Sequence, residues 1–311
     1  PYLDGFKIYI IPDAGARLAA LRTKQIHIIF SQPGISLAEK RIVEAQFPGQ
    51  LIAEKQLYLM ADLIYLKVAT PPFNDVRVRR AISLASDREE SFQLVYQGMG
   101  IVSGPMPVEP YGKWSIPKAD LARMPGFGPD KAANIAEAKK LLAEAGYPDG
   151  FSATISAKVG YPQGIRLGEA LVSQLAKIGI KAKMELLEGG VFDTRVRQQH
   201  QFQISSYGSG VDLDDPDLMF SRLYISRGDA NLGEYSNPRL DELFEKQSRT
   251  LDYAERKQLV DQMQRIVLEE SPIVFMGYEE GITPRWAEVR GYRAPIFLYL
   301  VHTLDYVWLA Q

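Results

Sequence analysis

The sequence predicts an α/β fold, and two observations on the residue pattern support this prediction. First, a strand at Phe151–Ala157, a helical stripe over residues 167–178 and a strand at Ile180–Leu186 follow one another. A strand–helix–strand unit of this kind joins two parallel strands of one sheet. Second, segments rich in β-branched and aromatic residues lie at both ends of the chain, at Phe6–Ile11 and in residues 278–311. They flank a middle part with long amphipathic helices, so we expect the chain to fold into two parts, one made of the two β-rich ends and one made of the middle.

The first part of the chain, residues 1–71, is predicted to alternate between strands and helices. Period-2 and apolar runs indicate strands, and apolar residues three and four apart indicate helices. The expected strands are Phe6–Ile11, Ile26–Phe30 and Leu57–Lys67, and the expected helices are Ala14–Leu21 and Leu37–Ala45. This part is too small to bury its own apolar strands, so it is expected to pack on something else.

Two consecutive helices are predicted after Pro71-Pro72. Asn74 or Asp75 is a good N-cap for the first, whose apolar face contains Val78, Ala81, Ile82 and Ala85. Ser86 and Glu89 have the spacing of a capping box, which predicts that a second helix starts there and ends at Gly98. Residues 99–130 are rich in Pro and Gly and are expected to form a loop.

The remaining elements are predicted by caps and periodicity. The expected helices are Ala132–Ala145, Phe192–Gln199, one that begins after Asn237-Pro238, and Tyr253–Glu269. The expected strands are Phe202–Tyr207, which runs into Gly208-Ser209-Gly210, and Ile273–Tyr278.

Composition excludes several classes of function. The formal net charge is −2, so no basic excess points to nucleic acid. There are no cysteines, which excludes disulfides and thiolate chemistry. The three histidines, His27, His200 and His302, share no helix face and form no zinc motif. We therefore expect no enzyme activity, no cofactor and no metal site.

Three segments together resemble one protein family. Residues 72–88 are PFNDVRVRRAISLASDR, residues 138–148 are AKKLLAEAGYP and residues 256–272 are RKQLVDQMQRIVLEESP. Each alone is only an amphipathic helix with caps, but in combination they are similar to the extracytoplasmic solute-binding proteins of family 5, the oligopeptide, dipeptide and nickel type. One departure is Thr23–His27, where the family usually has Gly-Glu followed by an apolar residue and Asp.

The resemblance implies a fold like that of the type II periplasmic binding proteins, with one lobe nearly complete and parts of the other. Residues 1–71 and 278–311 would belong to lobe I, and residues 72–277 would form lobe II. It further implies a C-terminal fragment of a longer protein that carries a signal sequence. The expected function is the substrate-binding component of an ABC importer, periplasmic or otherwise extracytoplasmic and possibly lipid-anchored, acting as a monomer with permease subunits. The alternative is a sensory or regulatory ligand-binding module on the same fold.

Candidate ligand-binding residues follow from the same resemblance. The family's peptide-binding members carry an acidic turn whose Asp pairs with the ligand's ammonium group, and this Asp matches Asp212; the family's Tyr is replaced by Leu213. Tyr207, Ser209 and Asp214 lie beside it in the sequence. The alternative to a ligand-binding role is that the acidic turn caps the helix that starts at Pro216.

Two aromatic residues of the Pro-rich loop complete the candidate set. Tyr111 and Trp114 are predicted to stack against a ligand, with ordinary packing as the alternative. Reversible capture between lobes also requires hinges. We expect them at Val68–Thr70 and Phe275–Tyr278.

Overall fold

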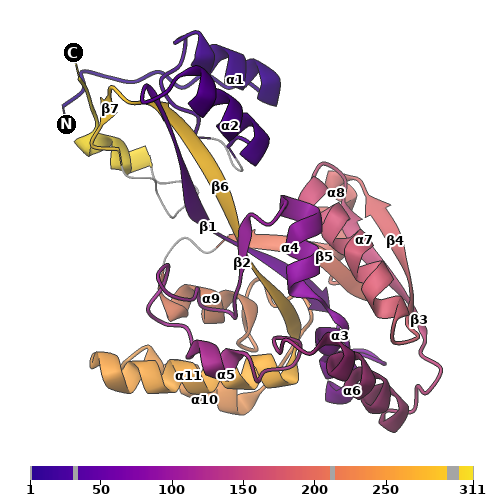
Figure 1. Cartoon of the computed structure of the whole chain (residues 1–311). Coiled ribbons are helices and arrows are strands. Elements are labelled where there is room, and N and C mark those ends of the chain that lie inside the picture. The colour runs from indigo at the N-terminus through magenta and orange to yellow at the C-terminus, as the bar shows by residue number, and fades with distance from the viewer. Residues whose placement is uncertain (1, 31–33, 211–213, 293–300, 311) are drawn as a thin grey trace. The chain divides into compact units, whose positions relative to one another are not determined.

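The computed structural model of the chain describes residues 2–30, 34–210, 214–292 and 301–310. These residues fall into two compact units, each described here by itself (Figure 1). Unit 1 contains residues 1–59 and 279–311, and unit 2 contains residues 60–278. Two long strands, β1 (Leu51–Leu66) and β6 (Ile273–Trp286), contribute residues to both units. The sequence placed the lobe limits at 71/72 and 277/278, and the division into lobes stays a prediction.

Unit 1 has few regular elements. It contains α1 (Ala14–Arg22), α2 (Leu37–Gln46), the first part of β1, the second part of β6, β7 (Val289–Arg290), the 3₁₀-helix η2 (Val301–Tyr306) and β8 (Trp308–Leu309). Both predicted helices are confirmed. Ser36 and Glu39 form a reciprocal capping box at the start of α2, which satisfies two backbone N–H groups that the helix leaves free.

Two strands predicted in unit 1 do not form. Residues 6–11 have no regular structure, and Ile26–Phe30 contributes only a bridge between Ile28 and Arg285. The composition of these segments favours strands, but a strand exists only where a neighbour supplies the ladder hydrogen bonds. Phe6 and Ile8 remain exposed in the described part of the chain.

Unit 2 contains a mixed sheet in the order β2-β6-β1-β5-β3-β4. Its further strands are β2 (Gly100–Val102), β3 (Ser152–Lys158), β4 (Lys181–Leu187) and β5 (Ile204–Gly210). Strand β3 runs parallel to both β4 and β5, whereas β1 and β5 are antiparallel. The predicted α/β class and the parallel strand–helix–strand unit are thus confirmed.

Helices cover this sheet and extend beyond it. They are α3 (Val76–Ala85), α4 (Arg88–Tyr96), α5 (Lys118–Leu121), α6 (Lys131–Glu144), α7 (Pro162–Ala176), α8 (Gly189–Phe192), the π-helix η1 (Asp193–Gln198), α9 (Pro216–Leu223), α10 (Pro238–Gln247) and α11 (Tyr253–Glu270). Helix α7 packs on β3, β4 and β5, and α3 lies beside α6 (Figure 1).

Three predictions for unit 2 need correction. The N-cap of α4 is Asp87, whose side chain accepts from the Glu90 N–H at 3.2 Å; the hydroxyl of Ser86 instead donates to Ile82 O at 2.8 Å, at the end of α3. The loop at 99–130 contains β2 and α5, and Ile116 and Leu121 are buried against Leu268 of α11. Strand β5 continues to Gly210, because pairing with β1 there outweighs the low strand propensity of glycine.

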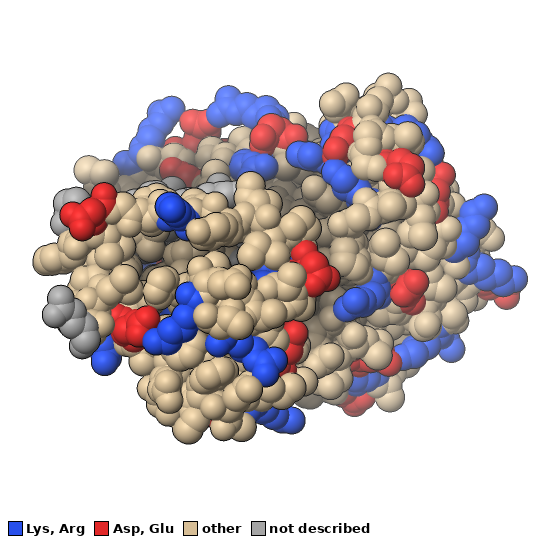
Figure 2. Space-filling view, turned by 90° about the horizontal axis from the view of Figure 1, so that it is seen from above, with Lys and Arg blue, Asp and Glu red and all other residues tan. Residues whose placement is uncertain are grey.

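The described surface has no dominant sign of charge on the face that Figure 2 shows, where basic and acidic side chains are interspersed. None of the helices in the described residues is both long and apolar enough to cross a membrane.

Candidate functional site: a polar pocket beside strand β5

A polar pocket of about 210 Å³ lies beside β5 in unit 2, and we call it the β5 pocket. Its lining residues come from five segments of the chain: Tyr65, Asp193, Arg197, Gln198, Tyr207, Ser209, Arg222, Asp229, Ala230 and Leu232. Tyr207 and Ser209 are two residues apart on β5, so their side chains share one face of the strand. Ser206 points to the opposite face, where its hydroxyl donates to Gly164 O of α7 at 2.7 Å. The pocket therefore lies on the face of β5 that α7 leaves uncovered.

The π-helix η1 forms one wall of the β5 pocket. Phe192 and Val196 are fully buried and anchor this segment. The Phe192 ring lies 5.1 Å from the Tyr207 ring, centroid to centroid. The residue after each buried anchor, Asp193 and Arg197, lines the pocket. A π-helix is rare and is frequently found at functional sites.

Charged groups of both signs line the β5 pocket. Asp193 is bound by two cations, Lys158 at 2.8 Å and Arg197 at 3.3 Å. The hydrogen bond from Lys158 is the largest cause that lowers the pKa of Asp193 below its ordinary value. Arg222, from α9, donates to Gly210 O at 3.2 Å and has its Nε 3.5 Å from a carboxylate oxygen of Asp229.

A buried phenol forms the base of the β5 pocket. Burial raises the pKa of Tyr65 well above its ordinary value. A hydrogen bond with Ser209 and the charges of Arg222 and Arg197 act in the opposite direction. The pocket thus offers guanidinium and hydroxyl donors, which suit reversible binding of an acceptor group.

A second group of candidates lies in the turn after β5. The Trp114 indole N–H donates to Asp214 O at 3.1 Å, so the structure brings these two predicted residues together. The Trp114 side chain is buried, with the Tyr253 ring at 5.1 Å and the Arg256 guanidinium at 4.8 Å from its ring. These contacts are packing contacts, and a ligand-stacking role of Trp114 stays a prediction.

The carboxylate of Asp214, in the turn after β5, is unusual in its burial. Its Oδ1 is buried without a hydrogen-bond partner among the described residues. Burial is the largest cause that raises its pKa above the ordinary value, while the backbone N–H and the charge of Lys113 lower it. Asp214 does not line the β5 pocket.

The other predicted residues have different outcomes. Asp212 lies outside the described residues. Tyr111 is partly buried in the same loop as Trp114, and its backbone N–H donates to Val108 O at 3.1 Å. The helix-capping interpretation of the acidic turn is confirmed for Asp215, whose side chain accepts from the Asp217 N–H at 2.9 Å.

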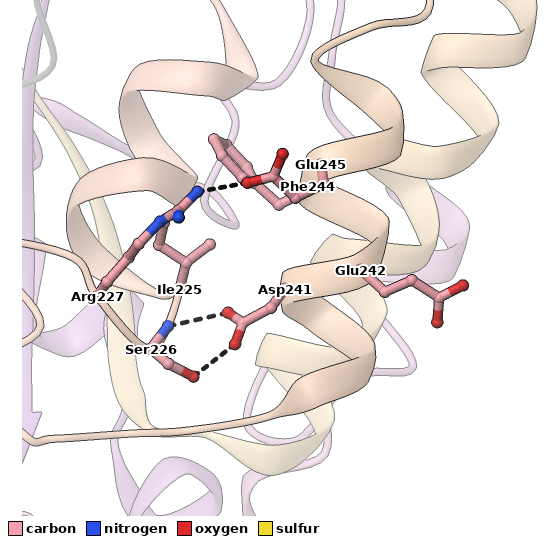
Figure 3. A pocket seen from close by; sticks show the side chains of 7 residues that line it. All are labelled: Ile225, Ser226, Arg227, Asp241, Glu242, Phe244 and Glu245. Carbon is pink, nitrogen blue, oxygen red and sulfur yellow. Dashed lines mark hydrogen bonds and ion pairs between the residues drawn. The ribbon is translucent and has the colours of Figure 1, made fainter.

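A larger pocket, of about 400 Å³, lies between α10 and the segment that follows α9 (Figure 3). Its polar side chains are already paired with one another. Asp241 accepts from the backbone N–H of Ser226 at 2.9 Å and from its hydroxyl at 2.6 Å, and Glu245 binds Arg227. Glu242 points away in Figure 3 and pairs with Arg239. These bonds attach the segment to α10 and occupy Asp241, Glu245 and Arg227 with partners inside the protein.

Unit 1 contains an apolar pocket of about 590 Å³, formed by residues 3–11, 25–30 and parts of 289–309. Nothing in the described residues indicates what occupies it. Among the same described residues, no group of three or more His, Cys, Asp or Glu side chains is arranged to hold a metal ion.

The arginines and the phenol of the β5 pocket are not among the residues that the sequence predicts for the site. Arg197 follows Asp193 by four residues, a spacing that places both on one side of a helical turn, so a signal was present. Arg222 and Tyr65 carry no such signal, because only the folding of α9 and β1 against β5 places them at the pocket.

Comparisons with known proteins agree with the family resemblance that the sequence shows. The family model described as bacterial extracellular solute-binding proteins, family 5 Middle, matches residues 1–231. The heme-binding protein A of Haemophilus influenzae is 29% identical over 303 residues, which cover 96% of this chain and 52% of that protein. The dipeptide-binding protein of Escherichia coli is 26% identical and covers 94% of this chain and 53% of that protein. The chain spans about half the length of the curated relatives it matches.

A solved structure shows the same fold. The ABC transporter-associated periplasmic binding protein DppA from Helicobacter pylori, solved in complex with the peptide STSA, is 26% identical to this chain and has a TM-score of 0.73. The match covers 97% of this chain and 56% of the other. The prediction of a type II periplasmic-binding-protein fold, present in part, is therefore confirmed.

Proposed function

The chain belongs to the bacterial extracellular solute-binding proteins of family 5, and on this premise we propose that it forms part of the substrate-binding component of an ABC importer. The component captures a solute reversibly between two lobes and delivers it to the membrane permease. One observation carries the proposal: the family match over residues 1–231 is accompanied by relatives of 26–29% identity along nearly the whole chain.

A peptide-like solute is the ligand class that we propose first. Two of the compared proteins support this choice, since one is named a dipeptide-binding protein and another was solved with a peptide. A further relative is named a heme-binding protein, so heme belongs in any ligand panel. Asp212 is proposed as the carboxylate that pairs with the ligand's ammonium group, while Tyr207 and Ser209 contact the ligand from β5.

The remaining parts of the proposal concern location, partners and chemistry. We place the component outside the cytoplasm, as a monomer that docks on permease subunits. It binds and releases its ligand without breaking a bond. The β5 pocket supports this view, because most of its lining side chains are hydrogen-bond donors or acceptors suited to reversible binding.

Calorimetric titration of the full-length protein with a panel of dipeptides, tripeptides and heme tests the function. We expect saturable binding of at least one peptide with a stoichiometry of one. The ligand is then released by denaturation and its mass measured. A ligand recovered intact agrees with a receptor, whereas a cleaved ligand, or a panel without any binder, contradicts the proposed function.

A further inference from the structure

Two arginine side chains reach the β5 pocket from separate elements. Arg197 comes from the π-helix η1 and Arg222 comes from α9. Both side chains are partly exposed, at 48% and 32%, so they are accessible to a solute. A guanidinium group presents a planar fork of donors that matches a carboxylate. The β5 pocket thus contains two guanidinium groups, and each of them is suited to bind a carboxylate.

The charges around the pocket leave an excess of positive charge. The lining residues Arg197 and Arg222 face the lining carboxylates Asp193 and Asp229, and Lys158 adds a cation through its 2.8 Å contact with Asp193. Among the residues that the structure describes, the group therefore has three cations and two carboxylates. One further anion would balance it.

The present partner of Arg222 is easily replaced. The carboxylate of Asp229 is 74% exposed and lies 3.5 Å from the Arg222 Nε, which is long for a hydrogen bond. An exposed ion pair of this kind contributes little to stability. Arg197 likewise shares Asp193 with Lys158, the closer cation. Within the described part of the chain, neither arginine is held by a carboxylate of its own at short distance.

We infer that the β5 pocket receives a carboxylate group of the bound solute, which Arg197 and Arg222 hold together, with the Ser209 hydroxyl as a further donor. This inference rests on the proposed function and narrows the ligand class to solutes with a free acid. The pocket's volume of about 210 Å³ limits the group to a small one, such as the terminal carboxylate of a peptide.

A matched pair of ligands tests the inference on the full-length protein. Alanyl-leucine and alanyl-leucinamide differ only in the terminal acid, and calorimetry gives their dissociation constants. We expect the acid to bind at least about tenfold more tightly, as for a hydrogen bond to a charged group. Arg197→Gln and Arg222→Gln should each reduce this preference to about twofold or less. Arg222→Lys, which keeps the charge but loses the fork, should retain part of it.

The control variant is Arg227→Gln, which removes an arginine of the pocket in Figure 3 and should leave the preference unchanged. Urea unfolding of every variant shows whether the protein still folds. Equal affinity of the unaltered protein for the acid and the amide would overturn the inference, while peptide binding itself would uphold the proposed function. The same conclusion follows if both Gln variants keep the full preference.

A second readout needs no peptide. Succinate and succinamide are added to ¹⁵N-labelled protein, and the Nε–Hε resonances of Arg197 and Arg222, assigned with the two variants, are followed. A shift caused by succinate alone supports the inference even if the peptide panel has no binder. Resonances that respond to neither compound, or equally to both, contradict it.

Discussion

At the residue scale, Arg88 shows how a buried charge organises unit 2. Its side chain is 1% exposed and donates to the backbone oxygens of Phe275 at 2.8 Å and Gly126 at 2.9 Å, and to the hydroxyl of Ser83 at 3.0 Å. Its guanidinium also lies 3.9 Å from the Phe127 ring centroid. One side chain thereby joins α3, the loop near residue 126 and β6.

Replacing this residue should be costly. In Arg88→Met the unbranched apolar side chain is shorter and has no donor, so several buried oxygens lose their partner and the space of the guanidinium is left empty. We expect the free energy of unfolding to fall by about 3–5 kcal/mol. The control is Arg123→Met, which removes a side chain that is 79% exposed and should cost about 0–1 kcal/mol. Urea unfolding measures both, and similar losses in the two variants would show that the buried bonds contribute little.

The carboxyl group of Asp214 makes stability depend on pH. Burial, as the largest cause, raises its pKa in the folded state, so the unfolded chain loses the proton at lower pH than the folded protein does. Ionisation therefore destabilises the folded state as the pH rises from the ordinary carboxyl value of about 3.9 through the raised value. Asp214→Asn, which cannot ionise, should gain stability over the unaltered protein between about pH 3 and pH 7. Urea unfolding across this range measures the gain, and a pH-independent difference would contradict this account.

At the element scale, α7 lies close to the sheet because glycine occupies the contact. A Cβ at Gly164 would lie 2.8 Å from the backbone oxygen of Ser206 and 2.5 Å from the Tyr161 ring. A Cβ at Gly168 would meet Met184 at 2.6 Å. The helix therefore packs on β5 at a distance that a larger residue does not allow.

Two glycine-to-alanine substitutions distinguish the effect of this close contact on stability from the effect of helix propensity. Gly164→Ala should lower the free energy of unfolding by about 1–3 kcal/mol, because the Ser206 backbone cannot give way easily. Gly190→Ala in α8 meets nothing within 4 Å and should instead raise it by up to about 1 kcal/mol. Thermal or urea unfolding measures both. A stabilised Gly164→Ala variant would mean that α7 can move off the strand without cost.

The elements that the sequence predicts well are those with local signals. Asn237 caps α10 by accepting from the N–H groups of Arg239 and Leu240, and it follows directly from the Asn-Pro pattern. The elements that it misses depend on distant partners. The sequence predicts a helix at residues 192–199 but not its π-helical form over residues 193–198, and the Gly-Ser-Gly end of β5 is a strand because β1 pairs with it.

At the scale of the whole molecule, the family resemblance predicted more of the structure than the residue pattern did. It implied the fold, which is confirmed, and a ligand role for the acidic turn, which stays a prediction, whereas the β5 pocket is assembled from β1, η1, β5, α9 and the segment after it. Such an assembly depends on the register of β1 against β5, in which Leu63 lies opposite Tyr207. A single sequence does not encode that register in a form that can be read locally.

The proposed function has a thermodynamic consequence for the whole protein. A solute that binds the folded state alone stabilises it by about 2.7 kcal/mol at one hundred times its dissociation constant, and by about 4.1 kcal/mol at one thousand times. Urea unfolding of the full-length protein, monitored at several concentrations of the peptide found by calorimetry, should follow this logarithmic increase.

Because the chain contains two units, its unfolding can show two transitions, and the effect of a ligand on each transition can be measured. Both β1 and β6 contribute residues to unit 1 and unit 2, and each strand is a covalent link between them. If the units unfold in separate steps, a solute held by both lobes should raise both midpoints, whereas a solute bound by unit 2 alone should raise only one. A non-binding sugar at the same concentrations is the control. Stabilisation that does not increase with peptide concentration, or that the sugar reproduces, would contradict specific capture.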